Sequence, residues 1–153
     1  MSFGVRTAPA RAPTLTLTLV PVLMLMLAQQ PVLAAARPAP PADAASLQRG
    51  EQIYTRCAAC HAIDRNRTGP QHCGLFGRQA GTAPGFDDYS KAMRDSKIVW
   101  NARSLNIFLQ APTEAVPGTS MGYAGVKDAQ ERADLIAWLQ KATRPGVTCT
   151  LSH

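Results

Sequence analysis

Apolar side chains recur at helical spacing in the last third of the chain. Leu135, Trp138, Leu139 and Ala142 stand at positions i, i+3, i+4 and i+7, which is the pattern of one buried helix face. Residues 144–146, Arg-Pro-Gly, are expected to end this helix, because proline and glycine stop helices. The pattern predicts an amphipathic helix that packs against the core.

Capping residues mark the starts of two helices. Asp128, followed by Glu131, makes a D-x-x-E start that is similar to a capping box. Asn101 is predicted to cap a second helix over residues 101–110, which Pro112 is expected to stop. The apolar face of this second helix is formed by Leu105, Phe108 and Leu109.

The rest of the chain predicts short helices and much irregular structure. A helix is expected over residues 47–56, capped by Ser46, and one or two helical turns over 90–96. Residues 68–85 are rich in glycine and proline and are predicted to form a loop. So long a loop in a small domain normally packs around something, which suggests a bulky cofactor. No segment alternates like a strand, so the predicted fold class is small all-α.

Composition narrows the class of protein. The chain has 153 residues, of which 46% are hydrophobic and 17% charged, so one folded domain is expected and a disordered polyelectrolyte is excluded. The formal net charge is +6, without Lys/Arg runs or interleaved aromatic residues, which gives no support to nucleic-acid binding. The folded domain is expected over residues 46–153, after a flexible Pro/Ala-rich linker over 37–45.

Residues 1–36 have the pattern of a cleaved secretory signal. Arg6 and Arg11 precede the apolar segment 15–28, and the three alanines at 34–36 offer a small-residue cleavage site. As a helix the apolar segment would rise about 21 Å, less than a bilayer core of about 30 Å. An uncleaved N-terminal anchor is the alternative. The mature protein is expected in the periplasm, where thiols tend to form disulfides.

The pentapeptide Cys-Ala-Ala-Cys-His at residues 57–61 carries the clearest chemistry. In a C-x-x-C-H motif, Cys57 and Cys60 can add to the two vinyl groups of a haem, and His61 can ligate the iron. A thioredoxin-type disulfide is a second reading, but its βαβ context is missing. A zinc site made with His72 and Cys73 is a third, and chance occurrence of the motif is the fourth.

The other side of such an iron would need a ligand for electron transfer, whereas an open site favours gas binding or peroxide chemistry. After residue 36 the chain has two methionines. Met93 lies in a predicted helix and is interpreted as a packing residue. Met121 lies in the irregular segment 117–122, where packing does not require a thioether, and it is the candidate ligand.

The chain resembles the class I c-type cytochromes, close to the mitochondrial type and its soluble bacterial relatives, over residues 49–143. The resemblance implies an all-α class I cytochrome c fold, with about four or five short helices and long loops wrapped around one covalently attached haem c. The matching segments are CAACH (57–61), GPQHCGLFGR (69–78), PGF (84–86), YSKAMRDSKIVW (89–100), VPGTSMGYAG (116–125) and ERADLIAWLQKAT (131–143).

The resemblance also implies roles for the residues nearest the iron. Cys57 and Cys60 would hold the haem, His61 would be the proximal iron ligand and Met121 the distal one. The carbonyl group of Pro70 would accept a hydrogen bond from the other ring nitrogen of His61, which fixes the tautomer and makes the imidazole more basic.

More distant positions match the walls of the family's haem pocket. Arg78, Tyr89 and Trp100 match donors to the haem propionates, and Thr119 matches a hydroxyl near the floor of the pocket. Tyr123 matches an aromatic residue beside the exposed haem edge. Trp100 as a plain core residue and Arg78 as a solvated surface charge are the alternatives.

Two differences from the mitochondrial type affect function. Phe108 stands where that type has a tyrosine near the methionine sulfur, so the reduction potential cannot be transferred. The lysine ring around the haem edge is reduced mainly to Arg56 and Lys127, which puts an acidic docking partner in doubt. Residues of other types occupy the lysine positions, namely Thr113, Glu114 and Ser120.

Two further cysteines and two histidines have no role in this scheme. If haem consumes the motif cysteines, Cys73 and Cys149 remain as an even pair in an oxidising compartment and are candidates for a disulfide. Two unrelated thiols are the alternative. His72 stands where the family has an apolar core residue and is expected to be a buried histidine with a hydrogen-bond partner. A pH-sensitive surface group and an alternative iron ligand in a non-native state are the other readings, and His153 has no predicted role.

The expected function is that of a periplasmic monohaem c-type cytochrome, a single-electron carrier with six-coordinate His/Met iron, and not an enzyme. Its expected partners are redox proteins, either a membrane respiratory complex or a periplasmic dehydrogenase or oxidase, and membrane attachment is expected only if residues 1–36 are retained. The alternatives are a haem enzyme or gas sensor with a labile sixth ligand, and a dedicated cytochrome subunit of one periplasmic oxidoreductase.

Overall fold

The computed structural model describes residue 4, residues 42–146 and residue 149. The predicted signal segment other than residue 4, most of the linker and His153 therefore lie outside the described residues. The described part is all-α, as predicted, and contains no named strand. Its helices are α1 (Ala44–Tyr54), α2 (Lys91–Asp95), α3 (Ala102–Gln110), α4 (Pro112–Ala115) and α5 (Ala129–Ala142).

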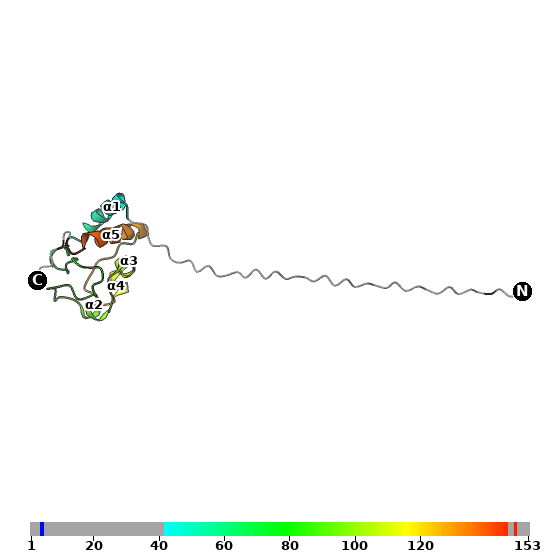
Figure 1. Cartoon of the computed structure of the whole chain (residues 1–153). Helices are drawn as coiled ribbons and strands as arrows, with labels where there is room; N and C mark the ends of the chain where they lie inside the picture. The colour runs from blue at the N-terminus through cyan, green and yellow to red at the C-terminus, as the bar shows by residue number, and fades with distance from the viewer. Residues whose placement is uncertain (1–3, 5–41, 147–148, 150–153) are drawn as a thin grey trace. The chain divides into compact units, whose positions relative to one another are not determined.

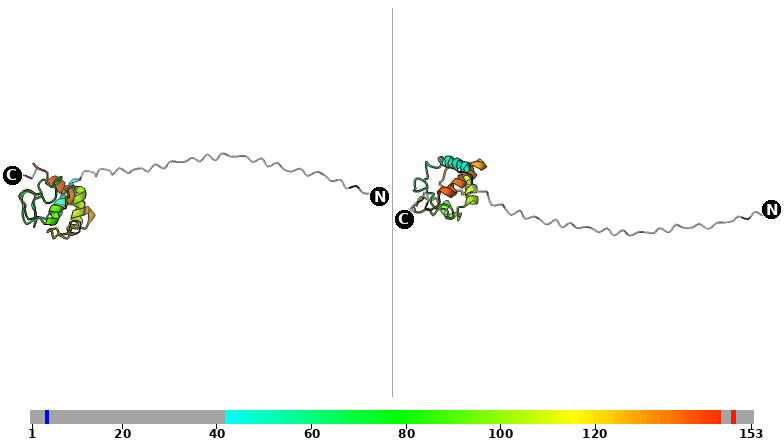
Figure 2. Two further views of the ribbon diagram at one scale, coloured as in Figure 1. Left: turned by 90° about the horizontal axis from the view of Figure 1, so that it is seen from below. Right: turned by 45° about the horizontal axis from the view of Figure 1, so that its top comes forward.

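Helices α1 and α5 pack against each other (Figure 1), and they remain adjacent in the right-hand view of Figure 2. Gly50 allows the close approach, because a Cβ at this position would lie 2.2 Å from the carbonyl oxygen of Asp134. One turn further along, the rings of Tyr54 and Trp138 are 4.6 Å apart. This contact forms one wall of the core.

Asp134 is the polar anchor of the same contact. Its buried carboxylate accepts hydrogen bonds from Ser46 Oγ at 2.6 Å, Arg49 Nε at 2.6 Å and Gln130 Nε2 at 3.0 Å. The hydrogen bond from Arg49 is the main cause that lowers the pKa of Asp134 to about 2. The carboxylate is thus held in its charged form by partners from both helices.

The start of α1 differs from the prediction. The helix begins at Ala44 and is capped by Asp43, whose carboxylate accepts from the backbone N–H of Ser46 at 2.6 Å. Ser46 was predicted as the cap, but its hydroxyl is used by Asp134 instead. The end of the predicted linker therefore belongs to the helix, because a second capping residue stood upstream of the expected one.

The caps predicted for α3 and α5 are present. Asn101 caps α3 in a reciprocal pair with Ser104, and Ser90, which was not predicted as a cap, caps α2. Asp128 caps α5 by accepting from the N–H of Glu131 at 2.8 Å. Pro112 does more than end α3, because it also stands at the first position of α4, where its missing N–H has no cost.

The predicted long loop runs between α1 and α2 and is tied to the segment before α3. Backbone hydrogen bonds join Gly77 N to the carbonyl of Trp100 at 2.8 Å, and Trp100 N to the carbonyl of Arg78 at 2.9 Å. The loop thus closes the side of the core that no long helix covers (Figure 1). None of the helices in the described part of the chain is long and apolar enough to cross a bilayer.

The Asp134 anchor predicts a pH dependence of stability. Since the pKa of Asp134 falls from its ordinary value of 3.8 to about 2 in the folded state, its contribution is present above pH 4 and is lost as the pH falls from about 4 to about 2. Asp134→Asn should lower the free energy of unfolding by ~2 kcal/mol at pH 7 and flatten the fall between pH 4 and 2. Urea unfolding of the holoprotein across this range measures both effects.

The matched control is Asp95→Asn, which removes an exposed carboxylate paired with Lys91 on α2. Solvent screens such a pair, so this variant should change stability much less than Asp134→Asn. Equal effects of the two substitutions would contradict the role assigned to Asp134.

Candidate functional site

The imidazole of His61 lies just beyond α1 and is held from one side. Hydrogen bonds from the N–H groups of Cys60 and His61 to the carbonyl of Cys57 form a tight turn after the helix. The Nδ1 atom of His61 lies 2.8 Å from the carbonyl oxygen of Pro70 and must donate to it, since a carbonyl only accepts. This leaves Nε2 as the ring nitrogen with a free lone pair. Burial lowers the pKa of His61, which favours the neutral form that can ligate a metal.

The loop that carries Pro70 is aligned with the motif by backbone hydrogen bonds and by a close contact. A Cβ on Gly69 would lie 2.5 Å from Cε1 of the His61 ring, so only glycine fits there. This constraint was not found from the sequence, although Gly69 stands in a matched segment. The bonds are Gly69 N to Cys60 O at 2.7 Å, His72 N to Ala62 O at 3.0 Å and Cys73 N to Ile63 O at 2.7 Å.

His72 belongs to the site, which the sequence analysis did not predict. Its ring stacks on that of His61, with centroids 4.5 Å apart and planes at 21°. A hydrogen bond of 3.1 Å joins its Nδ1 to the hydroxyl of Tyr54, so the expected partner is present, although His72 is half-buried and not buried. Burial and the neighbouring imidazole hold the pKa of His72 well below its usual range. His72 therefore stands as a second neutral ring stacked on the first, and both rings line one cavity.

The zinc reading is not supported. In residues 42–146 and at residue 149, no three histidine, cysteine or acidic side chains converge as a metal site. The thioredoxin reading is equally disfavoured, since the described chain is helical and has no βαβ unit.

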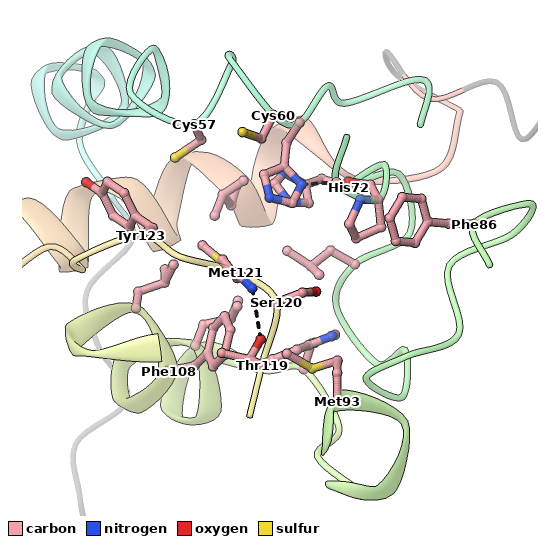
Figure 3. Close-up of a pocket in the computed structure, with 18 of the residues that line it drawn as sticks. Cys57, Cys60, His72, Phe86, Met93, Phe108, Thr119, Ser120, Met121 and Tyr123 are labelled. Atoms are coloured by element: carbon pink, nitrogen blue, oxygen red, sulfur yellow. Dashed lines mark hydrogen bonds between the residues drawn. The ribbon is translucent and has the colours of Figure 1, made fainter. Parts of the chain in front are cut away.

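A cavity of about 520 Å³ lies at the centre of the domain, within the size range of cofactor pockets. Figure 3 shows Cys57 and Cys60 on one side of this cavity and Met121 across it, on a different segment of chain. All ten residues that were predicted to hold or surround a haem line this one cavity. They are Cys57, Cys60, His61, Pro70, Arg78, Tyr89, Trp100, Thr119, Met121 and Tyr123.

The three residues predicted as propionate donors are held by the fold itself. Arg78 is half-buried and donates to the carbonyls of Cys73 at 2.6 Å and Gln71 at 2.9 Å, so it is not a solvated surface charge. The Tyr89 hydroxyl accepts from the N–H of Ala83 at 3.1 Å, which leaves its own hydrogen for another acceptor. Trp100 is buried and also lines the cavity. These contacts fix the three side chains without exhausting their donors.

Met121 reaches the cavity from an irregular segment. Its side chain is half-buried, and its backbone N–H donates to the hydroxyl of Thr119 at 3.3 Å (Figure 3). Met93, interpreted as a packing residue, is buried in α2 and lines the same cavity. Phe108 is buried beside Trp100, with ring centroids 5.1 Å apart, and adds no hydroxyl to this side.

Cys60, Tyr123 and Arg56 lie at the mouth of the cavity, where the positive charge of Arg56 is paired with a carboxylate. Cys60 is exposed and Tyr123 half-buried at this edge. Arg56, also at the edge, makes a bidentate ion pair with Glu131 on α5, at 2.7 and 2.9 Å. Glu131 was expected to complete the α5 capping box, and its carboxylate is paired with Arg56 instead.

The donor set fits a haem with one covalent edge. Two thiols lie at one side of the cavity, a neutral imidazole presents one free nitrogen, and a thioether comes from another segment. Apolar side chains make up much of the rest of the wall, which suits a porphyrin plane. The apolar lining includes Leu75, Leu105, Phe108, Leu109, Leu135 and Leu139. The site is thus that of a helical haem protein.

Comparisons with known proteins identify the family. The cytochrome c family model matches residues 47–143. Cytochrome c of Sesamum indicum is 45% identical over 109 residues, covering 69% of this chain and 95% of that protein, and cytochrome c2 of Blastochloris viridis is 43% identical over 116 residues, covering 74% and 88%. The structure of cytochrome cH from Methylobacterium extorquens has a TM-score of 0.60 and 36% identity, covering 65% of this chain and 99% of that one.

This chain belongs to the cytochrome c family. It is accordingly an electron-carrier haem protein with one covalently attached haem c.

The contact of Gly69 with His61 gives a direct test of the site geometry. Gly69→Ala must push the imidazole away from its hydrogen bond with Pro70, and an overpacked site of this kind costs ~1–3 kcal/mol. We therefore expect the thermal midpoint of the holoprotein to fall by ~10 °C, measured by circular dichroism. Gly122→Ala is the comparison variant, since a Cβ there meets no protein atom within 4 Å. Similar shifts for both variants would show that the contact is not critical.

Proposed function

We propose that this chain is a periplasmic single-electron carrier whose haem is attached through Cys57 and Cys60 and whose iron is ligated by His61 Nε2 and the Met121 sulfur. The observation that carries the proposal is that Nδ1 of His61 is already hydrogen-bonded to the carbonyl of Pro70. This leaves Nε2 of His61 and the sulfur of Met121, which line the same cavity, available to ligate a metal. Two axial ligands leave no site for a substrate, so the protein is a carrier and not an enzyme.

The bound haem supplies an iron that changes between the ferric and ferrous states. The chain tunes this change through its own groups. The hydrogen bond to Pro70 makes His61 a stronger donor, whereas the soft Met121 thioether and the buried cavity favour the ferrous state. Phe108 offers no hydroxyl toward this ligand, so the potential is set without a tyrosine hydrogen bond on that side.

The fold keeps these ligands in place during transfer. His61 is restrained by Pro70, by the close approach of Gly69 and by the stacked ring of His72. Restrained ligands rearrange little when the iron changes charge, which keeps outer-sphere transfer fast. The mouth beside Cys60 and Tyr123 is the proposed exit for the electron, because the cavity approaches solvent there.

The charge at this mouth limits the kind of partner that can dock. Arg56 is neutralised by Glu131 in a bidentate pair, and Lys127 is left as the other basic residue that the sequence analysis assigned to this edge. We propose docking that is small, transient and only weakly dependent on salt. A membrane respiratory complex or a periplasmic dehydrogenase or oxidase with a nearly neutral docking face suits this surface.

The ligand assignment is tested by a pair of methionine variants. Met121→Ala should turn the ferric haem high-spin and let the ferrous protein bind carbon monoxide rapidly at neutral pH. Met93→Ala is the matched control, since Met93 lines the same cavity from α2, and it should keep the low-spin spectrum. Absorption spectra of both oxidation states, with and without carbon monoxide, report the outcome. Rapid carbon monoxide binding by the unmodified protein would favour the gas-sensor or haem-enzyme reading.

Export is tested by the N-terminus of the mature protein. We propose that residues 1–36 are removed on export, so holoprotein from a periplasmic extract should begin at Arg37 by mass spectrometry. A membrane-bound holoprotein that retains residues 1–36 would contradict cleavage and would favour a tethered donor to one oxidoreductase.

A further inference from the structure

Two cysteines outside the haem motif meet in the core of the described chain. Cys73 has no exposed surface, and Cys149 is 4% exposed, although the two are far apart in the sequence. Both are free thiols in this structure, and Cys73 is one of the groups that raise the pKa of the Cys149 thiol. Two buried thiols on distant segments that approach each other in this way are candidates for a disulfide.

The backbone brings the two segments together independently of the thiols. The carbonyl oxygen of Thr143, at the end of α5, accepts from Gly74 N at 2.8 Å and lies 3.5 Å from Cys149 Sγ. Gly146 N also donates to the carbonyl of Cys149 at 3.2 Å. Thr143 is therefore a shared contact for the loop after His72 and for Cys149.

We propose that the mature protein carries a Cys73–Cys149 disulfide that ties the C-terminal segment to the loop holding the proximal histidine. The pairing rests on the proposed function in one respect, since haem attachment consumes Cys57 and Cys60 and leaves these two as the remaining thiols.

The bond forms by thiol–disulfide exchange with an external disulfide, such as a small oxidised thiol or a dithiol oxidase. The thiolate of one cysteine attacks the external disulfide, forms a mixed disulfide and releases one thiol. The second cysteine then attacks the sulfur of the first and releases the other thiol, so two thiol protons and two electrons pass to the oxidant. Burial raises the pKa of the Cys149 thiol, so the reactive thiolate is scarce while this residue is buried.

The disulfide would restrain the proximal side of the haem site. The carbonyl of Cys73 accepts a hydrogen bond from the Arg78 side chain, and the N–H of Cys73 donates to the carbonyl of Ile63. Cys73 therefore links the cavity wall to the segment after His61. Closing the long loop between Cys73 and Cys149 also reduces the freedom of the unfolded chain. The expected result is a more stable holoprotein, with the position of the imidazole unchanged.

The test counts thiols in the holoprotein. Cells are quenched in acid, the purified holoprotein is unfolded without reductant, and N-ethylmaleimide is added before intact-mass measurement. The disulfide predicts no added maleimide, and two after treatment with a phosphine reductant. Two added maleimides without reductant would overturn the proposal. The haem spectrum is recorded on the same sample, so failure of the haem assignment is seen separately.

Stability provides the second readout. Ascorbate keeps the haem ferrous in every sample without reducing disulfides, so the phosphine then acts on the disulfide alone. The thermal midpoint of the unmodified protein should fall by ~10–20 °C when the phosphine is added, whereas Cys149→Ser should start low and not respond. Equal midpoints with and without phosphine would contradict the proposal, even if Cys149→Ser itself were destabilised.

Discussion

The hydrogen bond from Nδ1 of His61 to the carbonyl oxygen of Pro70 joins the two segments on which the site is built. It determines which ring nitrogen is free, and it requires the following loop to run close beside the motif. Gly69 permits that approach, and the backbone bonds from His72 and Cys73 maintain it. The position of this attached segment sets where the rest of the loop begins, including the residues that form the opposite wall of the cavity.

Around this site the core surrounds a cavity instead of closing on itself. Leucines from α3 and α5 and aromatic residues from the loops face a volume of about 520 Å³. A domain of this size loses much packing by leaving such a space, so its stability depends on contacts outside the cavity and on the haem that belongs in it. The α1–α5 contact, with Gly50 against the backbone of Asp134 and the buried carboxylate satisfied by three donors, provides this support.

Several features separate this chain from the mitochondrial pattern, and they lie on different sides of the cavity. Beside His61, His72 stands where the family has an apolar core residue, and it stacks on the ligand ring. Near Met121, Phe108 replaces a tyrosine. At the mouth, residues of other types occupy the lysine positions, and Arg56, one of the basic residues that are left, is paired with Glu131. Each difference acts on a separate property of an electron carrier: the proximal ligand, the distal ligand and the docking surface.

The sequence by itself determined the haem-attachment motif and most helix starts, because these depend on local spacing: C-x-x-C-H, capping residues and apolar periodicity. The class and the other cavity residues came from the resemblance of whole segments to a known family. It misplaced the α1 cap, since Asp43 and Ser46 are both good caps and only the position of Asp134, far along the chain, decides between them. It left His72 without a role, because a ring stack is a contact between side chains that no spacing rule encodes. The pairing of Arg56 with Glu131 was likewise decided by the tertiary structure, which alone brings distant segments together. Cys73 and Cys149 were candidates from their number alone, and the tertiary structure added that both are buried.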